Sequence, residues 1–485
     1  MRKLNRCLGL ISFLFLLLFS VACGSSNGSV PGFIPKGNFS NASLNGQYVY
    51  QIEGFDFSNS TSGVPYREAG VFTANGAGGI TSVTDDFSEG STVLNTLSTG
   101  TYSIGNDGTG SLSFNNALGT INLAVALVTS SKVYLVEGDA VLNAGGLAEK
   151  QDATAIAAAP AGTFVFREHD VNSVNSVGSV GSFTVANGTV SSGAKDVNTA
   201  GVATSVAFTG GSFNAPDTLT GRGSGTFVDS SPATASFFYY IVDANNVRFL
   251  AGDPGVIGLG RAEKQSGTPA LSGSYAFGTK GDTLSFLGGM NSVGRFTASN
   301  GAISAGARDL VQDGNSVVNT AFTGSYTQTP NGRAALTLST AANNSLVVWM
   351  ISPSRGFFVV NDPNTIQEGT LDLQQSATFS NATMNGQFGF VMDGFDSGGD
   401  KERVGTLQWD GSGKLVLNEF SNAAGVITVP IVLSGSYSVS GNGRATGSIT
   451  NLSNNLVFYL VSGNDAYVIQ NDSGVEINGT ISKQQ

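Results

Sequence analysis

The chain is poor in the residues that enzymes and metal proteins most often use for chemistry. Its 485 residues include one histidine and two cysteines, and only 12% are Asp, Glu, Lys or Arg. A zinc site needs three or four nitrogen or sulfur ligands, so these counts exclude one. We expect the one histidine, His169, to lie on a solvent-exposed loop, because charged residues flank it and no Gly-x-Ser-x-Gly elbow lies nearby. We therefore predict no catalytic residue, no metal and no cofactor.

The balance of charge also excludes one class of partner. The chain has 23 Lys and Arg against 34 Asp and Glu, a net charge of −11. Nucleic-acid binding needs a basic surface that neutralises phosphates, so we expect no nucleic-acid partner. Both cysteines, Cys7 and Cys23, lie near the N-terminus. The rest of the chain therefore has no disulfide, and its stability must come from buried cores.

The N-terminus has the features of an export signal over residues 1–22. Three basic residues precede an apolar run of twelve residues, Leu8 to Phe19. That run is shorter than the ~20 residues that a membrane-spanning helix needs. The segment Ser20-Val21-Ala22-Cys23 resembles the lipobox of bacterial lipoproteins, although Ser20 departs from the usual Leu or Val. The resemblance implies that Cys23 is acylated and anchors the protein to a membrane of the cell envelope.

The residues after Cys23 refine this placement. Gly24-Ser25 lacks the Asp that, in lipoproteins, retains the protein in the inner membrane. The resemblance therefore implies the outer membrane where the cell has one, with the body facing either the periplasm or the cell surface. Residues 23–38 are rich in Gly, Ser and Pro, which indicates a flexible tether.

Four copies of one pattern fill the remainder of the chain. Each copy opens with a glycine two residues before an aromatic residue, and these glycines are 116, 111 and 113 residues apart: Gly46, Gly162, Gly273 and Gly386. Each copy closes on a tag that ends in glutamine: Glu149-Lys150-Gln151, Glu263-Lys264-Gln265, Leu373-Gln374-Gln375 and Lys483-Gln484-Gln485. We predict four repeats, at residues 39–152, 153–266, 267–376 and 377–485. An acidic residue also recurs within each copy, as Asp86, Asp196, Asp309 and Glu419.

The local patterns predict an all-β fold. Aromatic residues spaced by two place their side chains on one face of a strand. Asn-Gly or Asp-Gly pairs mark tight hairpin turns, among them Asn187-Gly188 and Asn300-Gly301. About eight short strands fit each copy, and closure into a barrel removes the exposed edges of a sheet. We therefore predict four tandem antiparallel meander β-barrels of about 110 residues. β-Sandwiches are an alternative, and so is an eight-bladed kelch-like propeller with blades of about 50 residues.

The Gly-x-aromatic opening of each eight-stranded copy resembles the calycin group, which includes lipocalins and avidins. In that group the motif opens the first strand of a barrel, and a barrel interior can hold a ligand. The resemblance does not identify a ligand. In a barrel, however, the eight aromatic residues on the first strands could line a ligand pocket, or they could equally fill the interior. They are Tyr48, Tyr50, Phe164, Phe166, Tyr275, Phe277, Phe388 and Phe390.

These observations favour a non-catalytic binding or adhesion module on a lipid anchor, with an extracellular glycan, a protein or a small hydrophobic molecule as ligand. Tandem copies on one chain could gain avidity. One alternative is a structural spacer or assembly component of the envelope. Another is a hydrolase, because Glu53 and Asp56 recur as Asp393 and Asp396 and paired carboxylates can cleave glycosidic bonds. Copies two and three lack this pair, so we expect ordinary loop residues.

Overall fold

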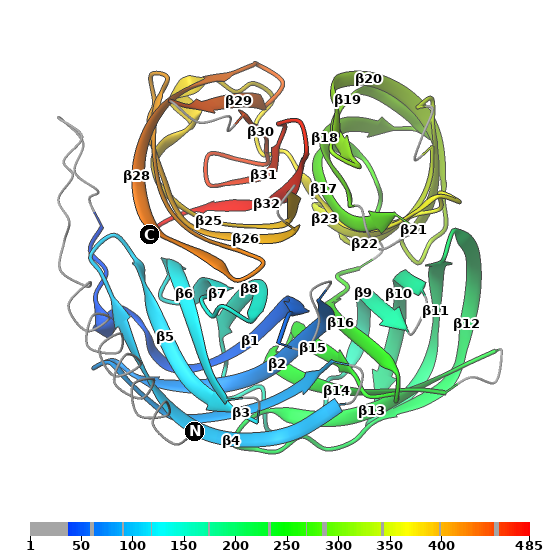
Figure 1. Cartoon of the computed structure of the whole chain (residues 1–485). Coiled ribbons are helices and arrows are strands. Elements are labelled where there is room, and N and C mark those ends of the chain that lie inside the picture. Colours follow the sequence, from blue (N-terminus) through cyan, green and yellow to red (C-terminus); the bar gives the residue numbers. More distant parts are fainter. Residues whose placement is uncertain are drawn as a thin grey trace, which may run out of the picture. The chain divides into compact units, whose positions relative to one another are not determined.

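The computed structural model describes residues 37–485, apart from 59–62, 90–91, 118, 173–174, 231–233, 268, 284–288, 341–343, 397–398 and 451–454. The described residues form 32 strands, two short 3-10 helices (Asn41–Ser43 and Asn381–Thr383) and no α-helix. No helix in this part of the chain is long and apolar enough to span a membrane. The strands close into four antiparallel barrels of eight strands, which confirms the predicted fold class over the sandwich and the propeller (Figure 1).

The first two barrels lie in the N-terminal half of the chain. The first barrel contains β1 (Asn45–Asp56), β2 (Val64–Asn75), β3 (Gly79–Ser88), β4 (Thr92–Ile104), β5 (Thr109–Asn116), β6 (Gly119–Thr129), β7 (Lys132–Glu137) and β8 (Leu142–Lys150). The second contains β9 (Gly162–Asn172), β10 (Asn175–Ala186), β11 (Thr189–Thr199), β12 (Val202–Phe213), β13 (Arg222–Asp229), β14 (Thr234–Asp243), β15 (Asn246–Ala251) and β16 (Val256–Lys264). In each, the last strand pairs with the first and closes the sheet.

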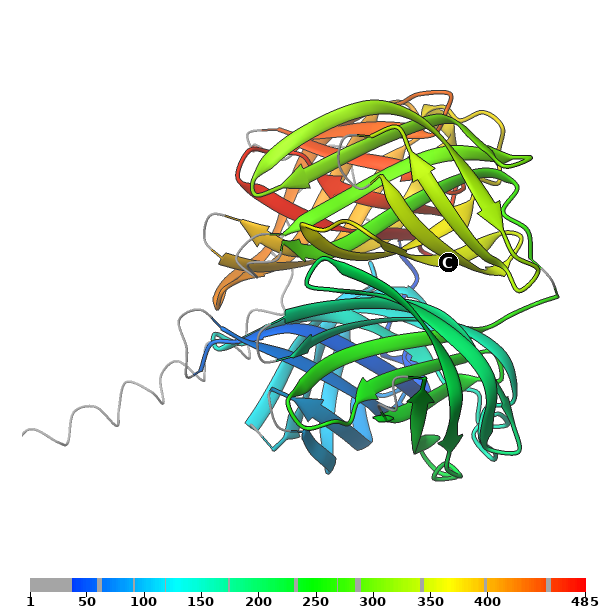
Figure 2. The ribbon, with the colours of Figure 1, turned by 90° about the vertical axis from the view of Figure 1, so that its right-hand side faces the viewer.

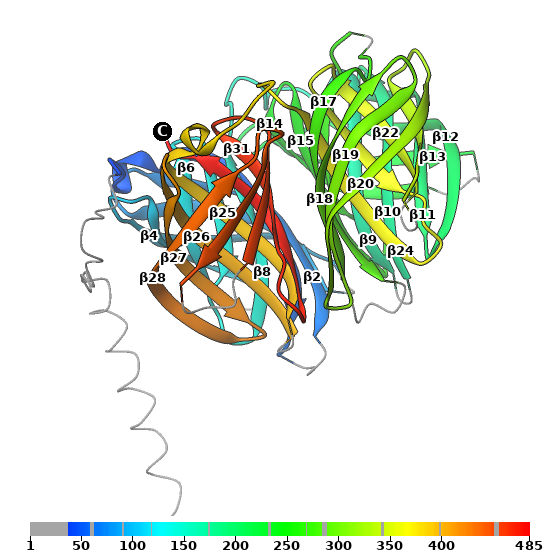
Figure 3. The same cartoon turned by 90° about the horizontal axis from the view of Figure 1, so that it is seen from above.

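The other two barrels repeat this order. The third contains β17 (Gly273–Thr283), β18 (Met290–Ser299), β19 (Ala302–Gln312), β20 (Asn315–Gln328), β21 (Arg333–Leu338), β22 (Ser345–Ser352), β23 (Arg355–Val360) and β24 (Thr365–Leu373). The fourth contains β25 (Asn385–Asp396), β26 (Gly399–Asp410), β27 (Lys414–Ala423), β28 (Val426–Val439), β29 (Arg444–Ile449), β30 (Asn455–Leu460), β31 (Asp465–Gln470) and β32 (Val475–Lys483). Within single barrels, Figures 2 and 3 show the neighbouring strands running obliquely, as closure of an eight-stranded sheet requires.

Asn187-Gly188 and Asn300-Gly301 form the tight two-residue turns that the sequence predicts. Ala186 at the end of β10 pairs with Thr189 at the start of β11, which leaves a two-residue loop. Both loop residues have positive φ, 51° at Asn187 and 74° at Gly188. Asn and Gly tolerate this conformation best, and it matches the twist of the flanking strands.

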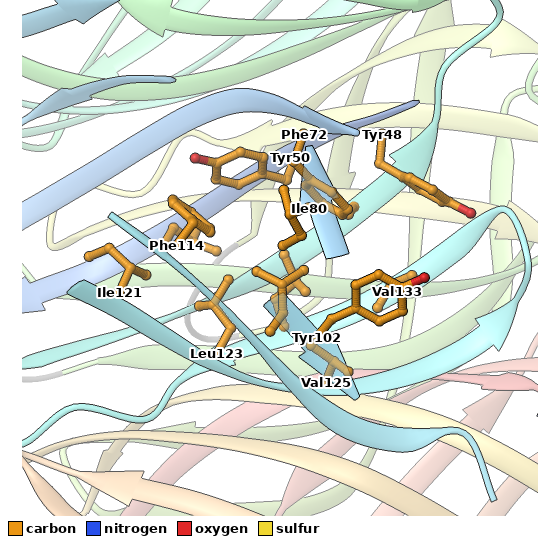
Figure 4. Close-up of a cluster of buried hydrophobic side chains, with 14 of the residues drawn as sticks. Tyr48, Tyr50, Phe72, Ile80, Tyr102, Phe114, Ile121, Leu123, Val125 and Val133 are labelled. Atoms are coloured by element: carbon orange, nitrogen blue, oxygen red, sulfur yellow. The ribbon is translucent and has the colours of Figure 1, made fainter. Parts of the chain in front are cut away.

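Each barrel interior is filled by its own side chains. In the first barrel, the ring of Tyr48 stacks on Phe72 with centroids 5.3 Å apart, and Tyr50 meets Phe114 edge-on at 5.7 Å. Figure 4 shows these rings pointing inward with Leu123 and other aliphatic residues around them. An eight-stranded barrel is just wide enough for such a plug, so each barrel has an apolar core of its own.

The outer faces of the barrels pack on one another in cyclic order. Each of four buried apolar clusters combines two barrels: first with second, second with third, third with fourth, and fourth with first. We call each of these contacts between two barrels a seam. One contributing pair from each seam, in that order, is Val71 with Tyr240, Val180 with Trp349, Val293 with Tyr459, and Val136 with Val404. The fourth repeat therefore contacts the first, although the two are far apart in sequence.

The glutamine tags fasten each barrel to the next. The side-chain amide of Gln151 donates to the carbonyl oxygens of Thr220 (2.9 Å) and Ile241 (2.5 Å) in the second barrel. The same two bonds recur from Gln265 to Asn331 and Met350, and from Gln374 to Asn442 and Leu460. Gln484 donates to Asp107 (3.0 Å) and Leu127 (2.6 Å), which closes the cycle onto the first barrel. In the last two tags, the first glutamine of the pair makes these bonds.

The recurring acidic residue forms a second contact at three of the seams. Asp309 accepts from Arg444 Nε at 2.8 Å, from Arg444 Nη2 at 2.7 Å and from the hydroxyl of Tyr459 at 2.7 Å. Equivalent groups are Asp86 with Arg222 and Tyr240, and Asp196 with Arg333 and Trp349. We call each group of carboxylate, arginine and aromatic residue a latch. A fully buried charge is stable only when it is paired in this way.

The seam between the fourth and first barrels has no latch. In the three latches, the arginine and the aromatic residue are cross-strand partners, as in the pair Arg444 and Tyr459. The corresponding partners in the first barrel are Thr109 and Ala126, which supply neither a charge nor an aromatic ring. Glu419, the fourth acidic residue, instead accepts from Arg403 of its own barrel at 2.9 Å. Among the described residues, this seam is held by apolar packing, the Gln484 contacts, amide bonds such as those of Asn422, and the bonds of Lys132 and Tyr134 to Ser482.

Candidate functional site

The aromatic residues singled out in the sequence lie inside the filled barrels. Their exposed fractions run from 0% at Tyr48 to 7% at Phe277. The complete set is Tyr48, Tyr50, Phe164, Phe166, Tyr275, Phe277, Phe388 and Phe390. None of them lines the cavity described next. Cys23, the other candidate, lies outside the described residues.

The largest cavity that we describe lies between barrels rather than within one. It has a volume of about 520 Å³, and all four barrels contribute to its wall. We call it the chamber. Glu149 of the first barrel, Arg261 of the second, Arg355 of the third and Tyr467 of the fourth are wall residues. This volume is within the ~300–1,000 Å³ typical of sites for small molecules.

Charged side chains from all four barrels line the chamber beside apolar and neutral polar ones, and most of the charged ones form pairs across seams. Arg248 of the second barrel pairs with Glu149 of the first. Arg355 of the third barrel contacts Glu263 of the second at 2.8 Å and Asp372 of its own barrel at 2.7 Å. The side chains of Arg355, Asp372 and Glu149 remain 20–30% exposed, which is the surface that they present to the chamber. A wall of this kind fits a polar or charged ligand better than a hydrophobic one.

Lys280 joins three barrels at one part of the wall. Its ammonium group contacts Glu53 of the first barrel at 2.9 Å and also pairs with Asp393 of the fourth. Burial alone would raise the pKa of Glu53, but the charges of Lys280 and Arg67 lower it well below its usual value. Burial lowers the pKa of Lys280, and the carboxylates of Asp393 and Glu53 more than offset this and raise it. Lys280 and Glu53 are therefore both charged at neutral pH.

The prediction that the recurring acidic pairs of the first and fourth copies are loop residues is wrong. Glu53 and Asp56 belong to β1, and Asp393 and Asp396 belong to β25. Asp56 accepts from the backbone amide of Ser58 at 2.6 Å, and Asp396 pairs with Lys401 at 2.9 Å. Glu53 and Asp393 lie where a neighbouring barrel supplies a compensating cation, Lys280 of the third barrel.

The prediction for His169 is also wrong. This residue lies in β9 and is only 5% exposed. Its Nε2 is 2.9 Å from the hydroxyl of Ser176 and 3.3 Å from a carboxylate oxygen of Asp282 in the third barrel. Burial lowers the pKa of His169, but the hydrogen bond and charge of Asp282, with the charge of Glu368, raise it overall. His169 is thus part of the seam between the second and third barrels.

The chemistry open to the chamber is that of ion pairing and hydrogen bonding. No group of three or more His, Cys, Asp or Glu suited to a metal ion occurs among the described residues. The wall carboxylates Glu53, Glu149 and Glu263 face cations in the pairs above, and these cations lower their pKa values. A carboxylate held in this way stays ionised and is a poor proton donor.

Sequence reasoning missed the chamber because its wall consists of outward-facing residues from separate copies. A weak signal was present. The chain has few charges, and several of them, such as Arg167, Arg248 and Arg261, interrupt apolar strands. A charged residue in an otherwise buried strand indicates a paired or functional site. The sequence alone does not say which copy supplies the partner.

No protein-family model matches the chain, and no curated protein matches its sequence. Among solved structures, transferrin binding protein B from serogroup B Neisseria meningitidis is similar at 11% identity over 73% of this chain and 83% of that chain, with a TM-score of 0.20. A double mutant of the vaccine antigen transferrin binding protein B from Haemophilus parasuis Hp5 gives 11% identity, the same coverages and a TM-score of 0.19. CghA with Sch210972 gives 8% identity over 90% and 88%, with a TM-score of 0.15. At such scores the chains do not superpose as wholes.

Proposed function

We propose that this protein is a cell-envelope lipoprotein that binds a small polar ligand in the chamber without transforming it. The observation that carries the proposal is a cavity of about 520 Å³ to whose wall all four repeats contribute. Its paired charges suit recognition, and buried apolar side chains pack inside each of the four barrels in the described part of the chain. The four copies thus make one site together, in place of four separate sites that would act through avidity.

The cyclic contacts favour binding over the spacer hypothesis. A spacer gains reach by adding copies end to end, whereas here the fourth barrel packs against the first. The hydrolase alternative finds little support in Glu53 and Glu263, because these wall carboxylates are held by Lys280 and Arg355. Filled barrels and a charged chamber also make a small hydrophobic ligand a poor fit.

Native mass spectrometry tests the binding site directly. The mature protein, purified from the bacterium that produces it, is expected to carry one ligand per chain. Thr480 lines the chamber, so Thr480→Trp should fill part of the cavity and displace the ligand. Thr446 is exposed on the same barrel, and Thr446→Trp is the matched control that should keep it. Four ligands per chain, or equal retention by both variants, would refute the proposal.

The lipid anchor needs a separate test. Basic residues, an apolar run and the cysteine Cys23 support a lipoprotein signal. In a bacterial host, metabolic labelling with an alkyne-tagged fatty acid should label the wild type, and the Cys23→Ser variant should be unlabelled. Ser25→Ala, two residues on, is the control and should be labelled like the wild type. Membrane association of Cys23→Ser at the wild-type level would contradict the anchor.

A further inference from the structure

Three arginines lie in a row on the outer face of the second barrel. Arg248 of β15 is the direct cross-strand partner of Arg261 of β16, and Arg261 is the partner of Arg167 of β9. Residues directly opposite one another point to the same face of a sheet, and like charges at such positions repel. All three arginines line the chamber. The row therefore destabilises the empty protein unless negative charge compensates it.

The two outer arginines have carboxylate partners, and the central one has none. Arg248 pairs with Glu149, and Arg167 Nη1 lies 2.6 Å from Glu368 Oε1. Among the described residues, Arg261 makes no ion pair and no side-chain hydrogen bond. Burial, with the charges of Arg248 and Arg167, lowers the pKa of Arg261 to about 9, although Glu149 and Glu263 act in the opposite direction. At neutral pH its guanidinium is therefore charged, and no carboxylate among the described residues forms an ion pair with it.

The fold itself does not require arginine at these positions. The corresponding cross-strand rows in the other barrels carry no charge. They are Tyr134, Leu147 and Gln51 in the first barrel, Phe357, Thr370 and Gly278 in the third, and Tyr467, Thr480 and Val391 in the fourth. The arginine row is thus specific to the second repeat, and packing does not explain it.

We propose that the chamber ligand carries an oxyanion group, a carboxylate or a phosphate, which binds Arg261 between Arg167 and Arg248. This inference rests on the proposed function and names the ligand class of the same site. A guanidinium presents a planar fork of N–H donors that fits two oxygens of either group. Arg261 and Arg167 also line a smaller recess of about 90 Å³. The chamber volume limits the ligand to a small organic acid or phosphate ester.

The test measures binding of citrate and of inorganic phosphate to the mature protein by isothermal titration at pH 7 and low salt. We expect binding with one equivalent per chain. Arg261→Thr, which installs the residue that the third and fourth barrels hold, should weaken binding about tenfold or more, because it removes a charge-assisted contact. Arg261→Lys should retain part of the affinity. A stronger response to citrate identifies a carboxylate site, and a stronger response to phosphate identifies a phosphate site.

A matched control separates a specific site from a change of net charge. Lys414 is an exposed cation of the fourth barrel outside the chamber wall, so Lys414→Thr should bind like the wild type. Without added anions, Arg261→Thr should melt at the same temperature as the wild type or higher, since it relieves repulsion. Equal binding by the wild type and Arg261→Thr would overturn the inference. So would an equal loss of binding in Arg261→Thr and Lys414→Thr. A neutral ligand found in the chamber would overturn it too and leave the proposed function intact.

Discussion

Loss of the arginine from one latch should destabilise the seam between the third and fourth barrels. Asp309 is fully buried (0% exposed), and Arg444 is 14% exposed. Arg444→Met keeps the aliphatic stem of the side chain. It leaves the buried carboxylate of Asp309 with two donors, the Tyr459 hydroxyl and the backbone amide of Asn319. Removal of one partner from a buried ion pair costs about 3–5 kcal/mol. Because two donors remain, we expect a loss near the lower end, about 3 kcal/mol.

Urea unfolding followed by tryptophan fluorescence measures this loss. Trp349 lies in the third barrel and Trp409 in the fourth, so one tryptophan reports on each of the two barrels that meet at this seam. The double variant Arg444→Met with Asp309→Asn should be more stable than Arg444→Met alone, because no buried charge is then left unpaired. Lys414→Met, at an exposed position, is the control. If Arg444→Met unfolds at the urea concentration of this control, the latch contributes nothing and our reasoning is wrong.

Three further predictions concern one residue each. Gln484→Ala should speed hydrogen exchange in β6 near Leu127, because the seam loses two hydrogen bonds worth about 0.5–1.5 kcal/mol each; unchanged exchange would contradict the role of the tag. The pKa of His169 is raised when folded, so its stabilisation is complete below its unfolded pKa of about 6.5 and is lost as pH rises through the folded value. His169→Gln should therefore cost more stability at pH 6 than at pH 9, and an equal cost would refute the pairing with Asp282. Burial and Glu68 raise the pKa of Asp85 to about 9. Since the unfolded pKa is about 4, the stability of the wild type should fall as pH rises between about 4 and 9. Asp85→Asn should reduce that fall in urea titrations at a series of pH values.

The repeats and the barrel fold could be predicted because they depend on local patterns. Spacing by two placed Tyr48 and Tyr50 on one face of β1, and Asn187-Gly188 gave the turn between β10 and β11. Both signals act within a few residues of the chain. A closed barrel of eight strands then follows from the need to pair every strand edge.

The docking of the barrels could not be predicted because each contact joins residues from different copies. Asp196 recurs in the sequence as a landmark, but its partner Arg333 is 137 residues further on. The prediction for His169 failed for the same reason. Its strand is covered on one side by its own barrel core and on the other by the third barrel. From the sequence, a polar residue with charged neighbours is expected to be exposed, because the sequence does not show that another barrel covers it.

The central claim is that the fourth barrel packs against the first and completes the chamber. The backbone amide of Gln485 donates to the carbonyl of Val128 at 3.1 Å, so the two backbones are direct neighbours across this seam. Val128→Cys with Gln485→Cys, in a Cys23→Ser background, should therefore form a disulfide on oxidation. A protease site placed between β16 and β17 then allows the chain to be cut into halves. We predict that the cut protein runs as one species on a non-reducing gel and as two after reduction, whereas two halves on the non-reducing gel would contradict the claim.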